Sequence, residues 1–185
     1  MRLFIAIELV EEIKNEIEDQ VKRLKRMGGN IRWVKREAMH LTLKFLGEVN
    51  EDRLGAIEKA MDRAVSDFTS FEISVEGCGT FPVGSARPRV LWIGVKEPKI
   101  LIALQEKLEE ELLTAGFQKE TRAFHPHVTL GRVKGTSALR RIVEEMKSME
   151  GYQFGSMEVD RIILFRSRLT PDGPIYTKIY EARLR

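Results

Sequence analysis

The tetrapeptides His40-Leu41-Thr42-Leu43 and His127-Val128-Thr129-Leu130 decide how the rest of this 185-residue sequence is interpreted. Each alternates a polar with an aliphatic residue, and successive side chains of a β-strand point to opposite faces of the sheet. Each strand therefore presents an imidazole and a hydroxyl on one face and two aliphatic side chains on the other. One such tetrapeptide would be a weak motif, but two of the three histidines in the chain occur in this context.

The segments around the two tetrapeptides occur in the same order, namely strand, long helix, tetrapeptide strand, helix and strand. Alternating apolar residues predict strands, and apolar residues at three- and four-residue steps predict helices. The expected strands are 3–7, 31–34, 40–46, 71–75, 90–95, 127–130, 154–159, 161–167 and 175–182, and the expected helices are 10–24, 54–65, 98–113 and 136–148. We interpret the chain as a single domain, 1–185, with an internal duplication whose pseudo-repeats span about 3–75 and 90–167.

Turn and cap residues separate these elements. Residues 77–89 contain three glycines and two prolines and predict a loop, and Thr170-Pro171-Asp172-Gly173-Pro174 predicts a turn. We expect Asn50 to cap the helix at 54–65, and a serine or threonine to cap the helix at 136–148.

The composition excludes several classes of protein. The single cysteine, Cys78, excludes a disulfide framework within the chain and a cysteine-based zinc site. No apolar run approaches the length of a membrane span, and the first residues lack the pattern of a signal peptide, so we expect a cytoplasmic protein without membrane contact. Asparagine and glutamine total only seven against abundant glutamate, lysine and arginine, a balance typical of thermophile proteins.

The duplicated residues suit chemistry at a phosphodiester. Histidine titrates near neutral pH, so one of two facing imidazoles can accept a proton from an incoming oxygen while the other donates one to the leaving oxygen. A hydroxyl beside each imidazole can donate a hydrogen bond to a non-bridging phosphate oxygen. This reaction requires no metal ion or other cofactor. The alternative for a single tetrapeptide is structural, because threonine is a favoured strand residue.

With both tetrapeptides in place, the sequence resembles the two-histidine phosphoesterases, and specifically the RNA 2′,3′-cyclic phosphodiesterases, also called 2′-5′ RNA ligases. The other segments that carry the resemblance are Phe4-Ile5-Ala6-Ile7, Leu43-Lys44-Phe45-Leu46-Gly47, Phe81-Pro82, Pro88-Arg89-Val90-Leu91-Trp92-Ile93-Gly94-Val95 and Pro126-His127-Val128-Thr129-Leu130-Gly131-Arg132. The resemblance implies a bilobal α+β fold in which two antiparallel sheets face each other across a central cleft, with helices outside and pseudo-twofold symmetry. It also implies hydrolysis of an RNA 2′,3′-cyclic phosphate to a 2′-phosphate, and some members join RNA ends through 2′,5′ linkages.

The resemblance implies that His40 is the proton donor and His127 the proton acceptor, with Thr42 and Thr129 beside them. It also implies that Arg132 binds phosphate. The odd spacing from His127 would place Arg132 on the opposite face, unless Gly131 permits a bulge.

Three further residues are candidate substrate contacts. Phe45 would stack on a base, although a core position is the alternative. Lys44, expected on the histidine face, would contact phosphate, and Phe81 would form a wall of the site. We expect Trp33 and Trp92 in the core.

Other functions remain open from the sequence. His40, His125 and His127 could together bind zinc, although such a site leaves both threonines without a role. The protein could also be a phosphodiesterase for small cyclic nucleotides, or an RNA-end binding module without catalysis. The expected partner is RNA with 2′,3′-cyclic phosphate ends, such as tRNA halves, bound by a monomer.

The formal net charge of +3 hides two basic segments. Residues 22–47 carry eight basic residues and one acid, and residues 119–141 carry six and one. Since each segment surrounds one tetrapeptide, we expect them to form one positive cleft suited to a polyanion.

Overall fold

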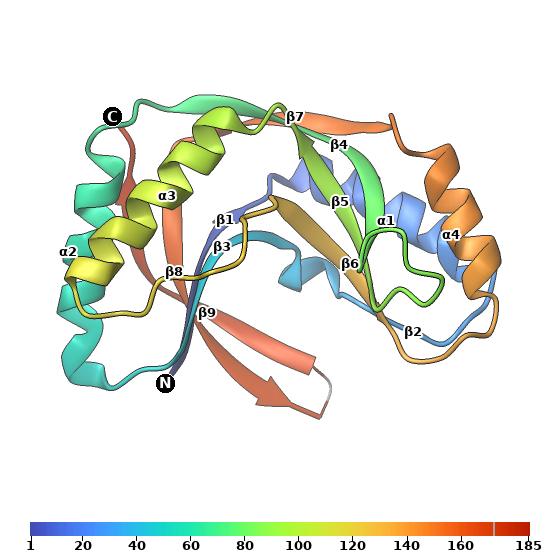
Figure 1. Cartoon of the computed structure of the whole chain (residues 1–185), viewed down its shortest axis with the longest axis horizontal. Coiled ribbons are helices and arrows are strands. Elements are labelled where there is room, and N and C mark those ends of the chain that lie inside the picture. Colours follow the sequence, from blue (N-terminus) through green and yellow to red (C-terminus); the bar gives the residue numbers. More distant parts are fainter. Residues whose placement is uncertain (172) are drawn as a thin grey trace.

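The computed structural model describes residues 1–171 and 173–185, and within them the chain forms nine strands and four α-helices (Figure 1). The strands are β1 (Arg2–Glu8), β2 (Ile31–Trp33), β3 (His40–Glu48), β4 (Phe71–Phe81), β5 (Val90–Lys96), β6 (His127–Val133), β7 (Gln153–Val159), β8 (Arg161–Thr170) and β9 (Gly173–Arg183). The helices are α1 (Glu11–Lys25), α2 (Leu54–Val65), α3 (Lys99–Thr114) and α4 (Leu139–Ser148), with short 3-10 helices at Arg36–Ala38 and Glu51–Arg53. Asp172, in the predicted turn at 170–174, lies outside the described residues.

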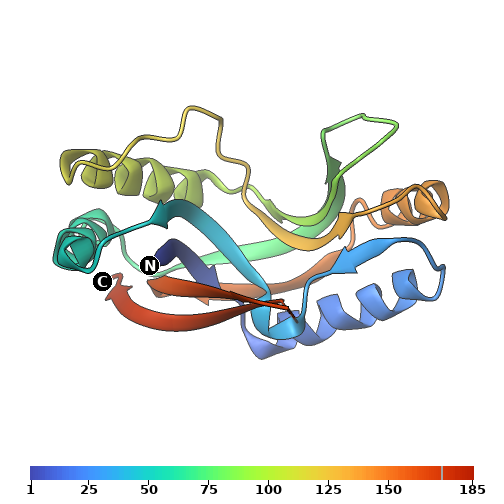
Figure 2. The ribbon, with the colours of Figure 1, turned by 90° about the horizontal axis from the view of Figure 1, so that it is seen from below.

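The strands form one curled antiparallel sheet in the order β7-β4-β5-β6-β3-β1-β8-β9, with β2 paired to β6 (Figure 2). Its two halves meet between β3 and β6, where only Leu41 and Val128 are paired. We call the half made of β3, β1, β8 and β9 the first lobe, and the half made of β6, β5, β4 and β7 the second lobe. The predicted α+β fold with two antiparallel sheets is confirmed, and the structure adds that the sheets are continuous through one residue pair.

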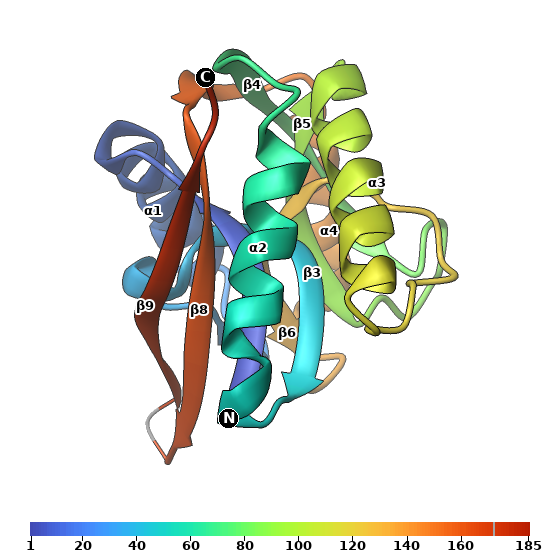
Figure 3. The same ribbon diagram turned by 90° about the vertical axis from the view of Figure 1, so that its left-hand side faces the viewer.

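Each lobe contains strands from both halves of the sequence. β8 joins β1 in the first lobe, and β4 joins β5 in the second. Helices α2 and α3 cover the outer face of the first lobe, and α1 and α4 cover the second (Figures 1 and 3). The strand order places β5 and β1 at equivalent positions on either side of the junction of β3 with β6, followed by β4 and β8.

The aliphatic residues of the two tetrapeptides anchor this junction in the core. Leu41 and Val128 are fully buried, and Leu43 and Leu130 are nearly so. Burying apolar side chains of this size contributes about 1.5–3 kcal/mol each. The opposite, concave face of the first lobe holds a smaller apolar cluster, and its members are Phe4, Ala6, Ile163 and Phe165, with Tyr176 packed against them.

A β-bulge at the last residue of each tetrapeptide reverses which face the later side chains occupy. In β3, Ala6 pairs with Thr42 but Ile5 pairs with Lys44, so Leu43 is the extra residue. In β6, Trp92 pairs with Thr129 but Leu91 pairs with Gly131, so Leu130 is the extra residue at the equivalent position. Because a bulge adds one residue to a two-residue repeat, residues five positions after each histidine return to the histidine face.

The residue after each bulge faces the core, and the two lobes accommodate it differently. In the first lobe it is Lys44, whose Nζ lies 2.7 Å from the Glu109 carboxylate and also donates to the carbonyl of Gln118. The prediction that Lys44 lies on the histidine face is therefore wrong, because the bulge at Leu43 turns it into a buried ion pair. In the second lobe the residue is Gly131, where a Cβ would lie 2.8 Å from Ile31 of β2.

Three local predictions are also corrected. β4 continues to Phe81, so residues 77–81 of the predicted loop are strand. Asn50 makes no side-chain capping hydrogen bond, because a 3-10 helix precedes α2. Helix α4 begins after Ala138, which has a left-handed backbone and caps the helix without a side-chain hydrogen bond.

None of the helices in the described part of the chain is long and apolar enough to cross a membrane.

A methyl group at position 131 should disturb the packing of β2 on β6. We expect Gly131→Ala to lower the free energy of unfolding by about 1–3 kcal/mol, as overpacking typically does. The matched control is Gly55→Ala in α2, where a Cβ meets nothing within 4 Å. Because alanine favours the helix, that variant should gain about 0.5–1 kcal/mol. Denaturant unfolding of both variants checks the prediction, and equal effects would contradict it.

Removing the Lys44 charge should leave Glu109 buried without its cation. We expect Lys44→Met to lower the free energy of unfolding by about 3–5 kcal/mol, because an uncompensated buried charge is costly. The double variant Lys44→Met/Glu109→Gln should recover a large part of this loss, since the amide oxygen still accepts the hydrogen bond of Gln105. A double variant as unstable as the single one would show that the lost charge is not the cause.

Candidate active site

The two tetrapeptides lie side by side at the junction of the lobes. Pairing of Leu41 with Val128 sets the register, so that His40 is opposite Thr129 and Thr42 is opposite His127. The two histidines are then diagonal neighbours on one face, a relation that places the Cα atoms of regular strands about 7–8 Å apart. All four predicted catalytic side chains therefore gather on one face, with each imidazole beside the hydroxyl of the other strand.

His40 lies against aromatic rings of the first lobe. Its ring centroid is 4.8 Å from that of Phe4 and 5.2 Å from that of Tyr176, which it meets edge to face. Burial lowers the pKa of His40 to about 4, and the charge of Lys14 acts in the same direction, whereas the carbonyl of Ala38 opposes them. The imidazole is therefore neutral at pH 7 in the free protein.

His127 has a defined tautomer. Its Nδ1 lies 2.6 Å from the carbonyl oxygen of His125, and because a carbonyl only accepts, Nδ1 carries the proton. The neutral imidazole therefore presents the lone pair of Nε2, as a proton acceptor must. Ala38 stands two residues before His40, and His125 stands two residues before His127. Each imidazole therefore interacts with the backbone carbonyl two residues earlier in the chain.

Trp92 belongs to this site and not to the core, which corrects the sequence prediction. It pairs with Thr129 across the β5–β6 ladder, and its ring lies 6.5 Å from His127. A Cβ on Gly79 would come within 2.4 Å of the indole, so glycine there leaves room for the ring. The signal that could have found it is strand alternation, which places Trp92 on the face opposite the buried Leu91 and Ile93.

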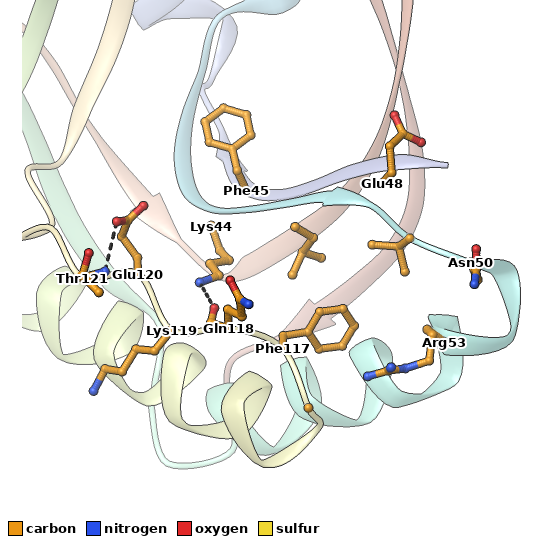
Figure 4. Close-up of a pocket in the computed structure, with 13 residues that line it drawn as sticks. Lys44, Phe45, Glu48, Asn50, Arg53, Phe117, Gln118, Lys119, Glu120 and Thr121 are labelled. Carbon is orange, nitrogen blue, oxygen red and sulfur yellow. Dashed lines mark hydrogen bonds between the residues drawn. The ribbon is translucent and has the colours of Figure 1, made fainter.

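The structure places three of the four predicted substrate contacts near the histidines. Phe81 meets His127 edge to face with the centroids 5.1 Å apart. Phe45 is 65% exposed, and its ring lies 5.9 Å from that of Phe4, which contacts His40. Figure 4 shows that Phe45 and Lys44 point to opposite sides of β3. Arg132 is exposed on the histidine face, as the bulge at Leu130 requires.

A polar cavity of about 650 Å³ has Phe45 in its lining, but none of the histidines or threonines of the two tetrapeptides lines it (Figure 4). It lies between the end of β3 and the segment that follows α3, and its lining includes Asn50, Arg53, Phe117 and Lys119. Lys44 and Gln118, which are joined by a hydrogen bond, also line it.

Several charges of the two basic segments are paired away from the histidines. Lys44 pairs with Glu109, Arg36 pairs with Glu11, and Arg23 pairs with Glu145. The positive cleft expected from both segments is therefore reduced, since pairing with nearby acids neutralises part of their charge. Arg132 keeps its charge on the histidine face, and it makes no ion pair within residues 1–171 and 173–185.

In the described residues, no three histidine, cysteine, aspartate or glutamate side chains converge as a metal site requires. The zinc site considered for His40, His125 and His127 is therefore not assembled. His125 is exposed and contributes its backbone carbonyl to the site.

Comparison with known proteins agrees with this geometry. Residues 10–170 match the family model of the 2′-5′ RNA ligase superfamily. The chain is 37% identical over 184 residues to an RNA 2′,3′-cyclic phosphodiesterase of Methanothermobacter thermautotrophicus, covering 100% of this chain and 99% of that protein. It is 40% identical over 186 residues to the protein of that name from Thermotoga maritima, covering 99% and 95%.

Solved structures share the fold. A protein of Thermus thermophilus superposes with a TM-score of 0.82 at 28% identity, covering 100% of this chain and 98% of that one. E. coli LigT in complex with 3′-AMP superposes with a TM-score of 0.77 at 28% identity, covering 99% and 97%. With two tetrapeptides on one face, a matching fold and full-length relatives, the chain belongs to the 2′-5′ RNA ligase superfamily.

Proposed function

We propose that this protein hydrolyses RNA 2′,3′-cyclic phosphate ends to 2′-phosphomonoesters by general acid–base catalysis from His40 and His127. The observation that carries the proposal is the pairing of Leu41 with Val128. In this register His40 and His127 are diagonal neighbours on one face of the sheet. The names of the full-length relatives support the reaction.

The mechanism uses one proton transfer at each histidine. Nε2 of His127 accepts a proton from water while the water oxygen forms a bond to phosphorus. The bond from phosphorus to the 3′ oxygen breaks, and His40 donates a proton to that oxygen. The product keeps the phosphate on the 2′ oxygen, and the two histidines exchange their protonation states.

In this mechanism the hydroxyls of Thr42 and Thr129 donate hydrogen bonds to the non-bridging oxygens. Charge on these oxygens grows in the transition state, so fixed donors stabilise it. The edge-to-face contacts of Tyr176 with His40 and of Phe81 with His127 hold the planes of the imidazoles.

As a proton donor, His40 must gain a proton that it lacks in the free protein. Burial without a counter-charge keeps it neutral, and an anionic phosphate beside the ring supplies that counter-charge. Binding of the cyclic phosphate therefore raises the pKa of His40 and charges the donor only when substrate is present.

The substrate class that fits these residues is RNA with a cyclic end, of which tRNA halves are one example. The 2′,5′ joining of RNA ends uses the same phosphate and the same two histidines, with a 5′-hydroxyl in place of water. Product analysis with a second RNA that carries a free 5′-hydroxyl separates the two reactions.

Loss of either histidine should remove the reaction while the fold remains. We expect His40→Ala and His127→Ala to lower kcat by about 10²–10⁴-fold on RNA with a 2′,3′-cyclic phosphate. His125→Ala is the matched control, because its backbone carbonyl still accepts from His127. Activity should persist after metal chelation. Full turnover in both histidine variants would contradict the mechanism, and loss on chelation would restore a metal-dependent one.

The titration of His40 should respond to an anion in the site. In the free protein we expect a pKa of about 4, measured by the NMR shifts of the ring protons, and a higher value when a nucleoside 2′-phosphate is bound. Between the ordinary value of 6.5 and about 4 the folded protein binds fewer protons than the unfolded chain. Stability should therefore fall as the pH is lowered through this window, and less so in His40→Ala. A His40 pKa that phosphate leaves unchanged would contradict the donor role.

A further inference from the structure

One row of residues crosses three strands of the first lobe beside His40. Arg2 of β1 pairs with Ser167 of β8, and Ser167 pairs with Tyr176 of β9. Paired residues point to the same face of a sheet, and Tyr176 lies on the face of His40, 5.2 Å away between ring centroids. The guanidinium of Arg2 and the hydroxyls of Ser167 and Tyr176 therefore form a continuous polar row next to the catalytic ring.

Arg132 approaches this row from the second lobe. The bulge at Leu130 directs Arg132 to the histidine face, which is also the face of Tyr176. The charges of Arg2 and Arg132 both oppose the rise in the pKa of Tyr176 that burial causes. Two arginines from different lobes thus lie on the face that carries the Tyr176 hydroxyl.

Across residues 1–171 and 173–185 neither arginine forms an ion pair, and Glu48, which pairs with Arg2 across the β1–β3 ladder, lies 3.5 Å from the N-terminal amine instead. Arg2 and Arg132 are exposed, and the hydrogen bonds and ion pairs found across residues 1–171 and 173–185 give neither side chain an acceptor. Other cations near the tetrapeptides do have such partners, as Lys44 has Glu109 and Lys178 has Glu8. Like charges that converge without a counter-ion favour an anionic ligand, and arginine suits phosphate because its planar donors bind two oxygens at once.

We propose that Arg2, Ser167 and Tyr176, together with Arg132, bind the phosphate on the 5′ side of the nucleotide that carries the cyclic phosphate. The inference rests on the proposed function, since it requires the cyclic end to lie between His40 and His127. The terminal ribose then spans from the histidines to the row, and its 5′ phosphate reaches the next cluster of donors. Such a site distinguishes an RNA end, which always has this phosphate, from a cyclic mononucleotide with a 5′-hydroxyl.

Binding of two reaction products tests the site without requiring turnover. Calorimetry would compare adenosine 2′-phosphate with adenosine 2′,5′-bisphosphate, which differ only in the 5′ phosphate. We expect the bisphosphate to bind the native protein about tenfold more tightly or better, the contribution of a charged hydrogen bond, and Arg2→Gln to remove most of that advantage. Arg2→Lys should keep part of it, because lysine retains the charge but not the paired donors.

The matched controls separate local from general effects. Arg26→Gln removes one exposed positive charge beside the C-terminal end of α1, away from the row, and should leave the advantage of the 5′ phosphate unchanged. Tyr176→Phe keeps the ring against His40 and removes only the hydroxyl, so it should lower the advantage in a protein that folds normally.

Kinetics on three substrates completes the test. These are cytidine 2′,3′-cyclic phosphate, its 5′-phosphorylated form and a dinucleotide with a cyclic end, and kcat/KM should be higher for the last two by about tenfold in the native protein but not in Arg2→Gln. Equal affinity of the native protein for the two product analogues, or an advantage that Arg2→Gln retains, would overturn the site. Bisphosphate selectivity without turnover of any substrate would retain the phosphate site and overturn the proposed function instead.

Discussion

A single backbone-paired contact, Leu41 with Val128, holds the two lobes in register, and the site depends on it. Both side chains are fully buried, so the contact is fixed from the core side of the sheet. Because side chains alternate, fixing two aliphatic residues in the core fixes His40 and His127 on the other face. Catalytic geometry therefore follows from apolar packing, and the polar residues need no contact with each other to be placed.

The sequence predicts the faces of the tetrapeptide side chains well and the surroundings of the tetrapeptides less well, for one physical reason. Alternation within four residues is a local property, so the faces of the histidines and threonines follow directly from it. At the last residue of each tetrapeptide a bulge adds a residue, and nothing in the sequence marks which residue is extra. Alternation alone therefore predicts the wrong face for Lys44, whereas the bulge expected beside Gly131 for Arg132 lies at Leu130. The place of Trp92 is missed because its aliphatic neighbours are typical of a strand that is buried on both sides.

The sequence also does not show which charged side chains are paired with one another. Counting basic residues near the tetrapeptides suggests a positive cleft, but pairing is decided by contacts that are distant in sequence, such as Arg23 with Glu145. Arg2 shows the opposite case. It lies in neither basic segment, but β1 stands between β3 and β8, so Arg2 lies in the same sheet as His40. The charges available to a ligand are those without an acidic partner, and they can be identified only from the folded structure.

The exchange of strands between the lobes has a consequence for how the chain acquires its structure. The partner of β1 on one side is β8, so Arg2 pairs with Ser167 only after almost the whole chain has been synthesised. Until β8 has been synthesised, one edge of β1 has no partner strand. A nascent chain that is still bound to the ribosome therefore has neither lobe fully formed. Contacts of this sequence separation make folding slow and expose unpaired edges to aggregation. The same connectivity means that the β3–β6 junction can form from residues 40–133, whereas the sheet on either side of it is completed only by β7, β8 and β9.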